Sequence, residues 1–221
     1  MEITYLGHSS FKLKSKDGLI IIIDPFDPNL VGLPFPKDVA DILVISHDHP
    51  DHNFRQAITG PVKRNETFVI ENEGEYEIGG VEISSIKTYH DKVEGAEKGK
   101  NLLTEIRMDG MTACHLGDLG HKLTESQIER LGSVDVLMVP VGDGYTLDMD
   151  SVFDMINDIQ PSLVIPMHFK VDGMKEGFEK LLPLQSFLDK SKYPLNGEPT
   201  HKLKVDDSSL PEDTQVVLMN G

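Results

Sequence analysis

A run of histidines and aspartates directly after a short apolar stretch constrains this chain more than any other feature. Residues 46–53 read SHDHPDHN, and they follow the apolar run Ile42–Ile45. The apolar run predicts a strand buried on both faces, so the polar residues fall at the carboxyl end of that strand. Side chains two residues apart in an extended chain point the same way, which directs His47 and His49 toward one point.

The second half of this motif presents two more potential ligands. The chain turns after Pro50, so the adjacent Asp51 and His52 can face a second point close to the first. Imidazole and carboxylate groups form a ligand set that suits zinc first, with manganese or iron as alternatives. A solvated polar turn is the competing interpretation, but these residues at these offsets arise by chance in on the order of one chain in a thousand. The motif therefore predicts a metal site at a strand end.

Further residues of the metal-binding type follow other predicted strands. They are His90 after the strand 83–89, Asp118 after the strand 111–116, and His168 after the strand 163–167. Sites in open α/β proteins gather at the carboxyl ends of strands, so we expect these three side chains to meet the motif at 47–52.

Hydrophobic patterns along the chain predict an α/β fold. Helices are expected at 124–131, 149–159 and 178–188, with a weaker signal around 54–58. Strands are expected at 3–6, 11–13, 19–24, 42–46, 67–70, 76–78, 81–86, 102–108, 111–116, 135–141, 163–167, 201–205 and 215–219. Two strand-rich halves, each followed by helices, predict two packed sheets with helices outside. Because no linker rich in Pro or Ser divides the chain, we expect residues 1–221 to form one domain.

The charge balance limits the possible partners. The 221 residues contain 21 Lys and Arg against 37 Asp and Glu, a formal charge of −16. This balance disfavours binding to nucleic acid or to an anionic membrane, since both need cations that neutralise phosphate. The single cysteine, Cys114, excludes an internal disulfide and fits a reducing compartment. The N-terminus has no signal-peptide pattern, and the longest apolar run, Leu19–Ile23, is too short to span a bilayer, so a cytoplasmic protein is expected.

Together these motifs resemble the metallo-β-lactamase superfamily. The resemblance extends to its short-chain branch of metal-dependent hydrolases related to ascorbate-6-phosphate lactonase. The phrases that carry it are TYLGHSS from Thr4, Asp24-Pro25, HDHPDHN from His47, Gly117-Asp118 and Pro166-Met167-His168. The superfamily implies a four-layer αββα sandwich with the site at one edge of its two sheets.

The resemblance also implies a role for each ligand candidate. The first metal would be held by His47, His49 and His90, the second by Asp51, His52 and His168, with Asp118 bridging the two. A water or hydroxide shared by the two ions would be the nucleophile, since such ions can lower the pKa of water from near 16 to about 7. Asp51 is in addition a candidate for orienting that nucleophile or moving its proton, so Asp51 and Asp118 are the predicted catalytic residues.

Several other polar residues are weaker candidates. The resemblance implies that His8 lies near the site but is not a ligand. Asp24 either accepts an N–H from a ligand histidine or caps a strand. For His115 a supporting role near the ligands and a plain buried hydrogen bond are equally favoured, whereas His121 is assigned to the rim of the site. The remaining candidates are Asp143, Gly144 and Tyr145 as pocket-lining residues, Lys100 as a solvated charge or an anion contact, and His201 as a surface residue.

The favoured activity is hydrolysis of an ester, lactone or phosphodiester bond in a small molecule by a dinuclear centre. Two cations dominate the local field, so an anionic substrate is compatible with the acidic surface. A nuclease is the first alternative, although the chain has no basic arm. A non-enzymatic, metal-stabilised binding module is the second, and a diiron redox centre is weaker still. The lactonase likeness also implies a homo-oligomer.

Overall fold

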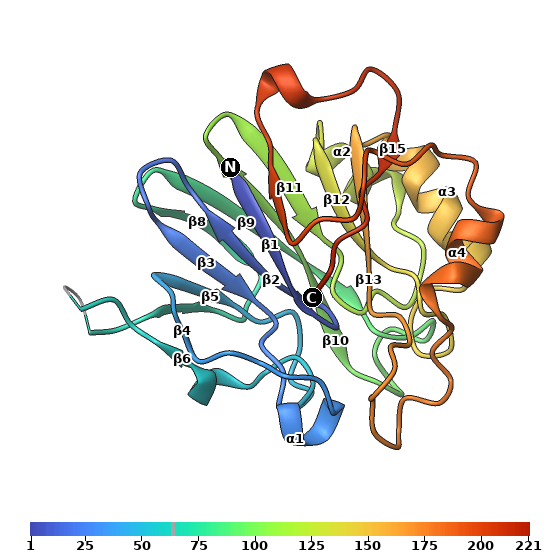
Figure 1. Ribbon diagram of the computed structural model, residues 1–221, viewed down its shortest axis with the longest axis horizontal. Coiled ribbons are helices and arrows are strands. Elements are labelled where there is room, and N and C mark those ends of the chain that lie inside the picture. The colour runs from blue at the N-terminus through green and yellow to red at the C-terminus, as the bar shows by residue number, and fades with distance from the viewer. Residues whose placement is uncertain (63–64) are drawn as a thin grey trace.

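Two sheets packed face to face form the centre of the molecule (Figure 1). The computed structural model describes residues 1–62 and 65–221. In that part of the chain the six-stranded sheet has the order β14-β1-β2-β3-β5-β7 and the seven-stranded sheet the order β15-β13-β12-β11-β10-β9-β8. The first sheet contains β1 (Glu2–Gly7), β2 (Ser10–Lys14), β3 (Ile20–Ile23), β5 (Ile42–Val44), β7 (Phe68–Ile70) and β14 (Lys202–Lys204). The second contains β8 (Gly74–Ile78), β9 (Val81–Tyr89), β10 (Lys100–Met108), β11 (Met111–His115), β12 (Val136–Pro140), β13 (Leu163–Met167) and β15 (Gln215–Val216).

Strand β3 shows why the first sheet must be covered on both faces. Ile21 and Ile23 belong to the large core between the sheets, whereas Ile22 belongs to a separate cluster on the opposite face. All three are fully buried. Because successive side chains of a strand point to opposite faces, the run of four isoleucines requires an apolar layer on each side.

The outer layers differ in thickness. The helices α2 (Glu125–Leu131), α3 (Met149–Ile159) and α4 (Leu184–Lys190) lie on the side of the seven-stranded sheet (Figure 1). Over the six-stranded sheet the cover comes from the two-stranded ribbon of β4 (Asp38–Val39) and β6 (Ile58–Thr59), next to the 3-10 turn η1 (Arg55–Ala57). The predicted α/β architecture of two packed sheets with outer elements is confirmed, with a thinner layer on this side.

Two of the predicted helices differ from those found. The weak signal around 54–58 corresponds to η1. The helix predicted over 178–188 is wrong in its first part, because α4 begins only after Pro183, whose backbone is extended. A proline lacks the N–H of a helix interior and restricts the residue before it. Phe178 and Leu181 pack instead against Phe26 and against Val31, the last residue of the short helix α1 (Pro28–Val31).

The strand directions gather the polar residues at one edge. Strands β1 and β2, and β2 and β3, are antiparallel while β3 and β5 are parallel, so β1, β3 and β5 run the same way. The same reasoning applies to β9, β11 and β13 in the other sheet. Backbone hydrogen bonds join the two sets of strand ends, from His168 N to His8 O at 2.8 Å and from Leu102 N to Ser46 O at 2.8 Å. The carboxyl ends of six strands therefore face one place.

A close backbone approach at this edge requires glycine. A Cβ atom on Gly142 would overlap the carbonyl oxygen of His168. Any larger residue there would push the chain after β13 away from its neighbour.

None of the helices in the described ranges is both long enough and apolar enough to cross a membrane.

Candidate metal centre

Three histidines from two sheets form the first group of the site. His47 and His49 follow β5 and His90 follows β9, and one ring nitrogen of each lies within 4.8 Å of the others. The ring centroid of His47 is 4.5 Å from that of His49 and 5.0 Å from that of His90. Thus the predicted first ligand set is brought together, although β5 ends at Val44 and the chain bends at residues 46–48.

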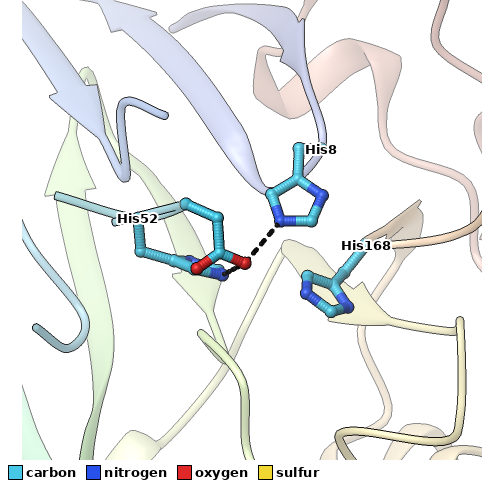
Figure 2. A group of neighbouring side chains, drawn as sticks. His8, His52 and His168 are labelled. Carbon is cyan, nitrogen blue, oxygen red and sulfur yellow. Dashed lines mark hydrogen bonds and ion pairs between the residues drawn. The ribbon is translucent and has the colours of Figure 1, made fainter. Parts of the chain in front are cut away.

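A second group lies beside the first. His8, Asp51, His52 and His168 offer ligand atoms that also lie within 4.8 Å of one another. Figure 2 shows the side chains of His8, His52 and His168 close to one another. The Nε2 atom of His8 lies 3.2 Å from Oδ2 of Asp51. His8 therefore belongs to this group by position, closer than the sequence indicated.

Asp118 lies between the two groups. Its Oδ2 is 3.2 Å from Nε2 of His90 and 3.2 Å from Nε2 of His168. Its Oδ1 is 3.4 Å from Nε2 of His52. One buried carboxylate thus contacts a histidine of the first group and two of the second, which is the position that a bridging ligand would need.

Several buried atoms in this cluster have no hydrogen-bond partner among the described residues. These atoms are Nε2 of His47 and His52, Oδ1 of Asp118, and Nδ1 of His8, His90 and His168. Buried polar groups are nearly always paired, so unpaired ones need an explanation such as an ion. Because imidazole nitrogen and carboxylate oxygen are the donors that zinc, manganese and iron share, the cluster fits divalent metal ions.

Asp24, at the end of β3, fixes the orientation of His52 directly and that of His47 through Ser46. Its Oδ2 accepts hydrogen bonds from Nδ1 of His52 at 2.9 Å and from the Ser46 hydroxyl at 2.5 Å. Since that hydroxyl donates to Asp24, Nδ1 of His47, 2.9 Å away, must in turn donate to the hydroxyl. One carboxylate therefore keeps a proton on Nδ1 of both histidines, so Nε2 is the nitrogen that is left to bind a metal when the ring is neutral. The prediction that Asp24 accepts an N–H from a ligand histidine is confirmed as a hydrogen bond.

Asn101 is a buried residue whose role the sequence did not reveal. Its amide donates to Thr88 Oγ1 at 2.8 Å and to Leu116 O at 2.9 Å, and its Oδ1 accepts from the backbone N of Asp118 at 2.9 Å. These bonds hold the turn that carries Asp118. Asn101 directly precedes the predicted strand 102–108, and no local signal in the sequence indicated this role.

Left-handed backbone conformations mark the same edge. His8, Asp24 and His168 have φ values of 54°, 46° and 53°. Such values are unfavourable for residues with a Cβ atom and concentrate at functional sites. The surrounding packing stabilises these conformations and so orients the side chains.

Burial and charge perturb the histidines in opposite directions. Burial holds the pKa of His47 well below its usual range and lowers the pKa of His168 to about 3. Burial also acts against the charged form of His52, but the carboxylates of Asp118 and Asp51 outweigh it and hold the pKa of His52 well above its usual range. Of these three histidines, His52 is therefore the one that carries a positive charge in the metal-free protein.

We expect the metal-free protein to lose stability on mild acidification. His47 and His168 have folded-state pKa values below 6.5, so the unfolded chain binds their protons first as the pH falls below that value. Each of these two histidines then lowers the free energy of unfolding by about 1.4 kcal/mol per pH unit. For His168 this loss continues down to about pH 3. The contribution of His52 has the opposite sign, being complete below pH 6.5 and lost as the pH rises through its raised pKa.

Urea unfolding of chelator-treated protein at several pH values measures this effect. A free energy of unfolding that stayed constant between about pH 7 and about pH 4 would contradict the burial of neutral histidines.

The remaining candidates lie around the cluster. Tyr145 lines the cavity of about 360 Å³ above it, as predicted, whereas Asp143 and Gly144 are not among the described residues that line it. His115 makes a plain buried hydrogen bond to Ser9 O at 2.9 Å, and His121 accepts from the backbone N of Tyr89. His201 is exposed, as predicted, and the thiol of Cys114 is buried with its pKa raised by burial, which leaves it unreactive.

Comparisons with known proteins agree with this geometry. The sequence profile described as the Beta-lactamase superfamily domain matches residues 2–168. A UPF0173 metal-dependent hydrolase from Methanosphaera stadtmanae is 29% identical over 210 residues, which cover 81% of this chain and 88% of that protein. A crystal structure from Thermotoga maritima, of a protein named as a Zn-dependent hydrolase of the metallo-β-lactamase superfamily, has a TM-score of 0.78 at 33% identity and covers 99% of this chain and 97% of its own. A metal-dependent hydrolase from Parabacteroides distasonis shares the fold, with a TM-score of 0.64 at 20% identity, over 99% of this chain and 93% of its own.

The chain belongs to the metallo-β-lactamase superfamily. Within that superfamily it is similar to proteins named as UPF0173 metal-dependent hydrolases.

Proposed function

We propose that the protein uses two divalent metal ions, zinc in the first instance, to hydrolyse an ester, lactone or phosphodiester bond of a small molecule. The observation that carries the proposal is the placement of Asp118 between two groups of ligand-type side chains. The first ion would be held by His47, His49 and His90, and the second by Asp51, His52 and His168. Asp118 contacts the first group through His90 and the second through His52 and His168, and it would bridge the two ions.

Paired divalent ions, when bound, lower the pKa of water and stabilise the attacking and leaving oxygens of a hydrolysis. The positions of the ions would be set by the protein. Asp24 orients His52 through a hydrogen bond, and Asn101 fixes the backbone of Asp118. Asp51 lines the cavity above the cluster. Although burial raises the pKa of this carboxyl, His52 and His8 outweigh that effect and keep it ionised. Asp51 can therefore accept a hydrogen bond from a water molecule and orient it.

The size of the cavity favours a small substrate. Its volume of about 360 Å³ lies within the range of ligand pockets, and Phe178 and Leu30 give it an apolar wall. A lactone or a short ester fits such a space, in keeping with the resemblance to the lactonase. The net charge of −16 still disfavours the nuclease, since each phosphate of a polynucleotide needs a neutralising cation.

Removal and return of metal tests the proposal. We expect the chelator-treated protein to be inactive on a panel of lactones, carboxylic esters and phosphodiesters. Activity should return with zinc or manganese at about two ions per chain by elemental analysis. As a matched control, His201→Ala at an exposed position should bind the same amount of metal as the parent protein.

A fully loaded protein without turnover on the whole panel would favour the non-enzymatic module. Cleavage of RNA or DNA that weakens steeply with salt would favour the nuclease instead.

A further inference from the structure

A second cavity adjoins the one above the metal cluster. It has a volume of about 370 Å³, and Lys87, Lys98 and Lys100 lie along it. His47 and His49 form the part of its wall nearest the metal cluster. Two residues, His49 and Lys98, line both cavities, so the two spaces meet at these side chains. A molecule whose reacting bond lies over Asp118 can therefore extend past Lys98 into the second cavity.

We propose that this second cavity, the lysine bay of Lys87, Lys98 and Lys100, binds an anionic group of the substrate, a phosphate or a carboxylate. The inference rests on the proposed hydrolysis at the metal cluster and adds the class of substrate to it. The reacting bond would lie at the metals and the anionic group at the lysines.

The gathering of these lysines is unusual for so acidic a chain. Cations are outnumbered, with 21 Lys and Arg against 37 Asp and Glu. Five lysines elsewhere pair with carboxylates, for example Lys12 with Asp38 at 2.7 Å and Lys92 with Asp148 at 3.0 Å, whereas others, such as Lys14 and Lys37, form no salt bridge among the described residues. Within residues 1–62 and 65–221, no salt bridge is formed by the three lysines of the bay. Their charges are thus available to a ligand.

Three carboxylates also line the bay, and two of them have partners. Glu71 pairs with the Arg55 guanidinium, and Asp48 accepts a hydrogen bond from the Asn53 amide at 2.5 Å. Glu73 is the third carboxylate. With Arg55 counted beside Glu71, four cationic side chains stand against the three carboxylates, which leaves an excess of one positive charge.

Lys98 is held in place by the loop that carries it. The carboxylate of Asp91 accepts four backbone N–H bonds, from Val93 at 2.9 Å, Gly95 at 2.8 Å, Glu97 at 3.0 Å and Lys98 at 2.8 Å. The Lys98 ammonium donates to the carbonyl oxygen of Tyr145 and lies 5.7 Å from the centre of the Tyr145 ring. Asp91 thus holds the backbone of the loop, and Tyr145 holds the ammonium group of Lys98. Lys98 therefore loses little conformational freedom when it binds an anion.

The chemistry of lysine suits this role. Its ammonium group is a compact charge with three donors on a flexible stem, which serves phosphate and carboxylate alike. Lys100 taken alone is better explained as a solvated charge. Three such groups on the wall of one cavity, next to a metal cluster, favour an anion site.

Two substrates with the same scissile bond test the proposal on the metal-loaded protein. One carries a remote phosphate or carboxylate and the other a neutral group of similar size. We expect kcat/KM to favour the anionic substrate, and the ratio of the two values to fall about tenfold in Lys98→Gln, as for one lost hydrogen bond to a charged group. A larger fall is expected when Lys87 and Lys100 are also replaced by glutamine. Comparing the phosphate with the carboxylate substrate identifies which anion is preferred.

The control is Lys92→Gln, which removes a lysine of the same loop that pairs with Asp148 outside the bay. Its ratio should equal that of the parent protein. An equal ratio in the parent protein and in the triple lysine variant would overturn the anion site while the hydrolase stands.

If the metal-loaded parent protein turns over neither substrate, the proposed hydrolysis is rejected. A binding measurement then tests the anion site of the lysine bay separately. Calorimetry with phenyl phosphate then compares the metal-loaded parent and triple variant. A loss of affinity of about tenfold or more in the variant supports the anion site, and equal affinity rejects it.

Discussion

Asp118→Asn is expected to lower kcat/KM by about 100-fold or more. Replacing a residue that only supports the metal ligands costs up to about 100-fold, and replacing a bridging ligand should cost at least as much. The buried carboxylate is 2% exposed and contacts His52, His90 and His168. Burial raises the pKa of Asp118, but His168 and His52 outweigh it and hold the pKa well below its usual range, so its charge is available at neutral pH. The amide keeps the shape and loses both the charge and one acceptor atom.

Metal content per chain and turnover are the two measurements for this variant. Asp158→Asn, an exposed carboxylate on α3, is the matched control and should resemble the parent protein. Full metal content and full turnover in Asp118→Asn would remove the bridging role and the mechanism built on it.

Asp24→Asn is expected to weaken metal binding by about 10-fold to 100-fold, although Asp24 is not one of the proposed metal ligands. Asp24 accepts from the backbone N of Ser46 at 2.7 Å, from the Ser46 hydroxyl and from Nδ1 of His52. An asparagine has one acceptor oxygen, so its amide must face a donor on one side or the other. If the amide faces His52, Nδ1 must accept and the proton moves to Nε2, the atom needed for a metal.

The second outcome of this substitution is lower stability of the metal-free protein, by about 1–3 kcal/mol for a buried donor left without an acceptor. Zinc titration and urea unfolding measure the two effects separately. Asp27→Asn makes a suitable control, because Asp27 is an N-cap residue of α1 that accepts from Asn29 N, and asparagine caps helices equally well. Unchanged zinc affinity in Asp24→Asn would show that the tautomers of His47 and His52 are set by other groups.

Local signals in the sequence predicted most elements well. The helix at 149–159 and the strand at 163–167 have the predicted bounds, and Thr124 and Gln127 form the predicted capping box. Asp109 and Gly110 both have positive φ at the predicted hairpin turn between β10 and β11. These features depend on residues a few positions apart, so periodicity and turn chemistry are sufficient to find them.

The errors and omissions have a common physical cause. Phe178 and Leu181 have helical spacing, but their packing against Phe26 and the extended backbone at Pro183 prevail. The contribution of Asn101 depends on the backbone N of Asp118, and that of Lys98 on a carbonyl distant in sequence. Propensity describes a residue by itself, whereas these roles are defined by partners that only the folded chain brings near.

The sequence by itself determined which residues could bind metal and that each follows a strand. Ligand chemistry belongs to the side chain, and the alternation of an extended chain is a local property. The tertiary structure alone decided that β1, β3 and β5 end beside β9, β11 and β13, that Asp118 lies between two histidine groups, and that three lysines share a cavity with His49. Strand order and the packing of one sheet on the other depend on contacts summed over the whole core, and such contacts leave no short-range pattern in the chain.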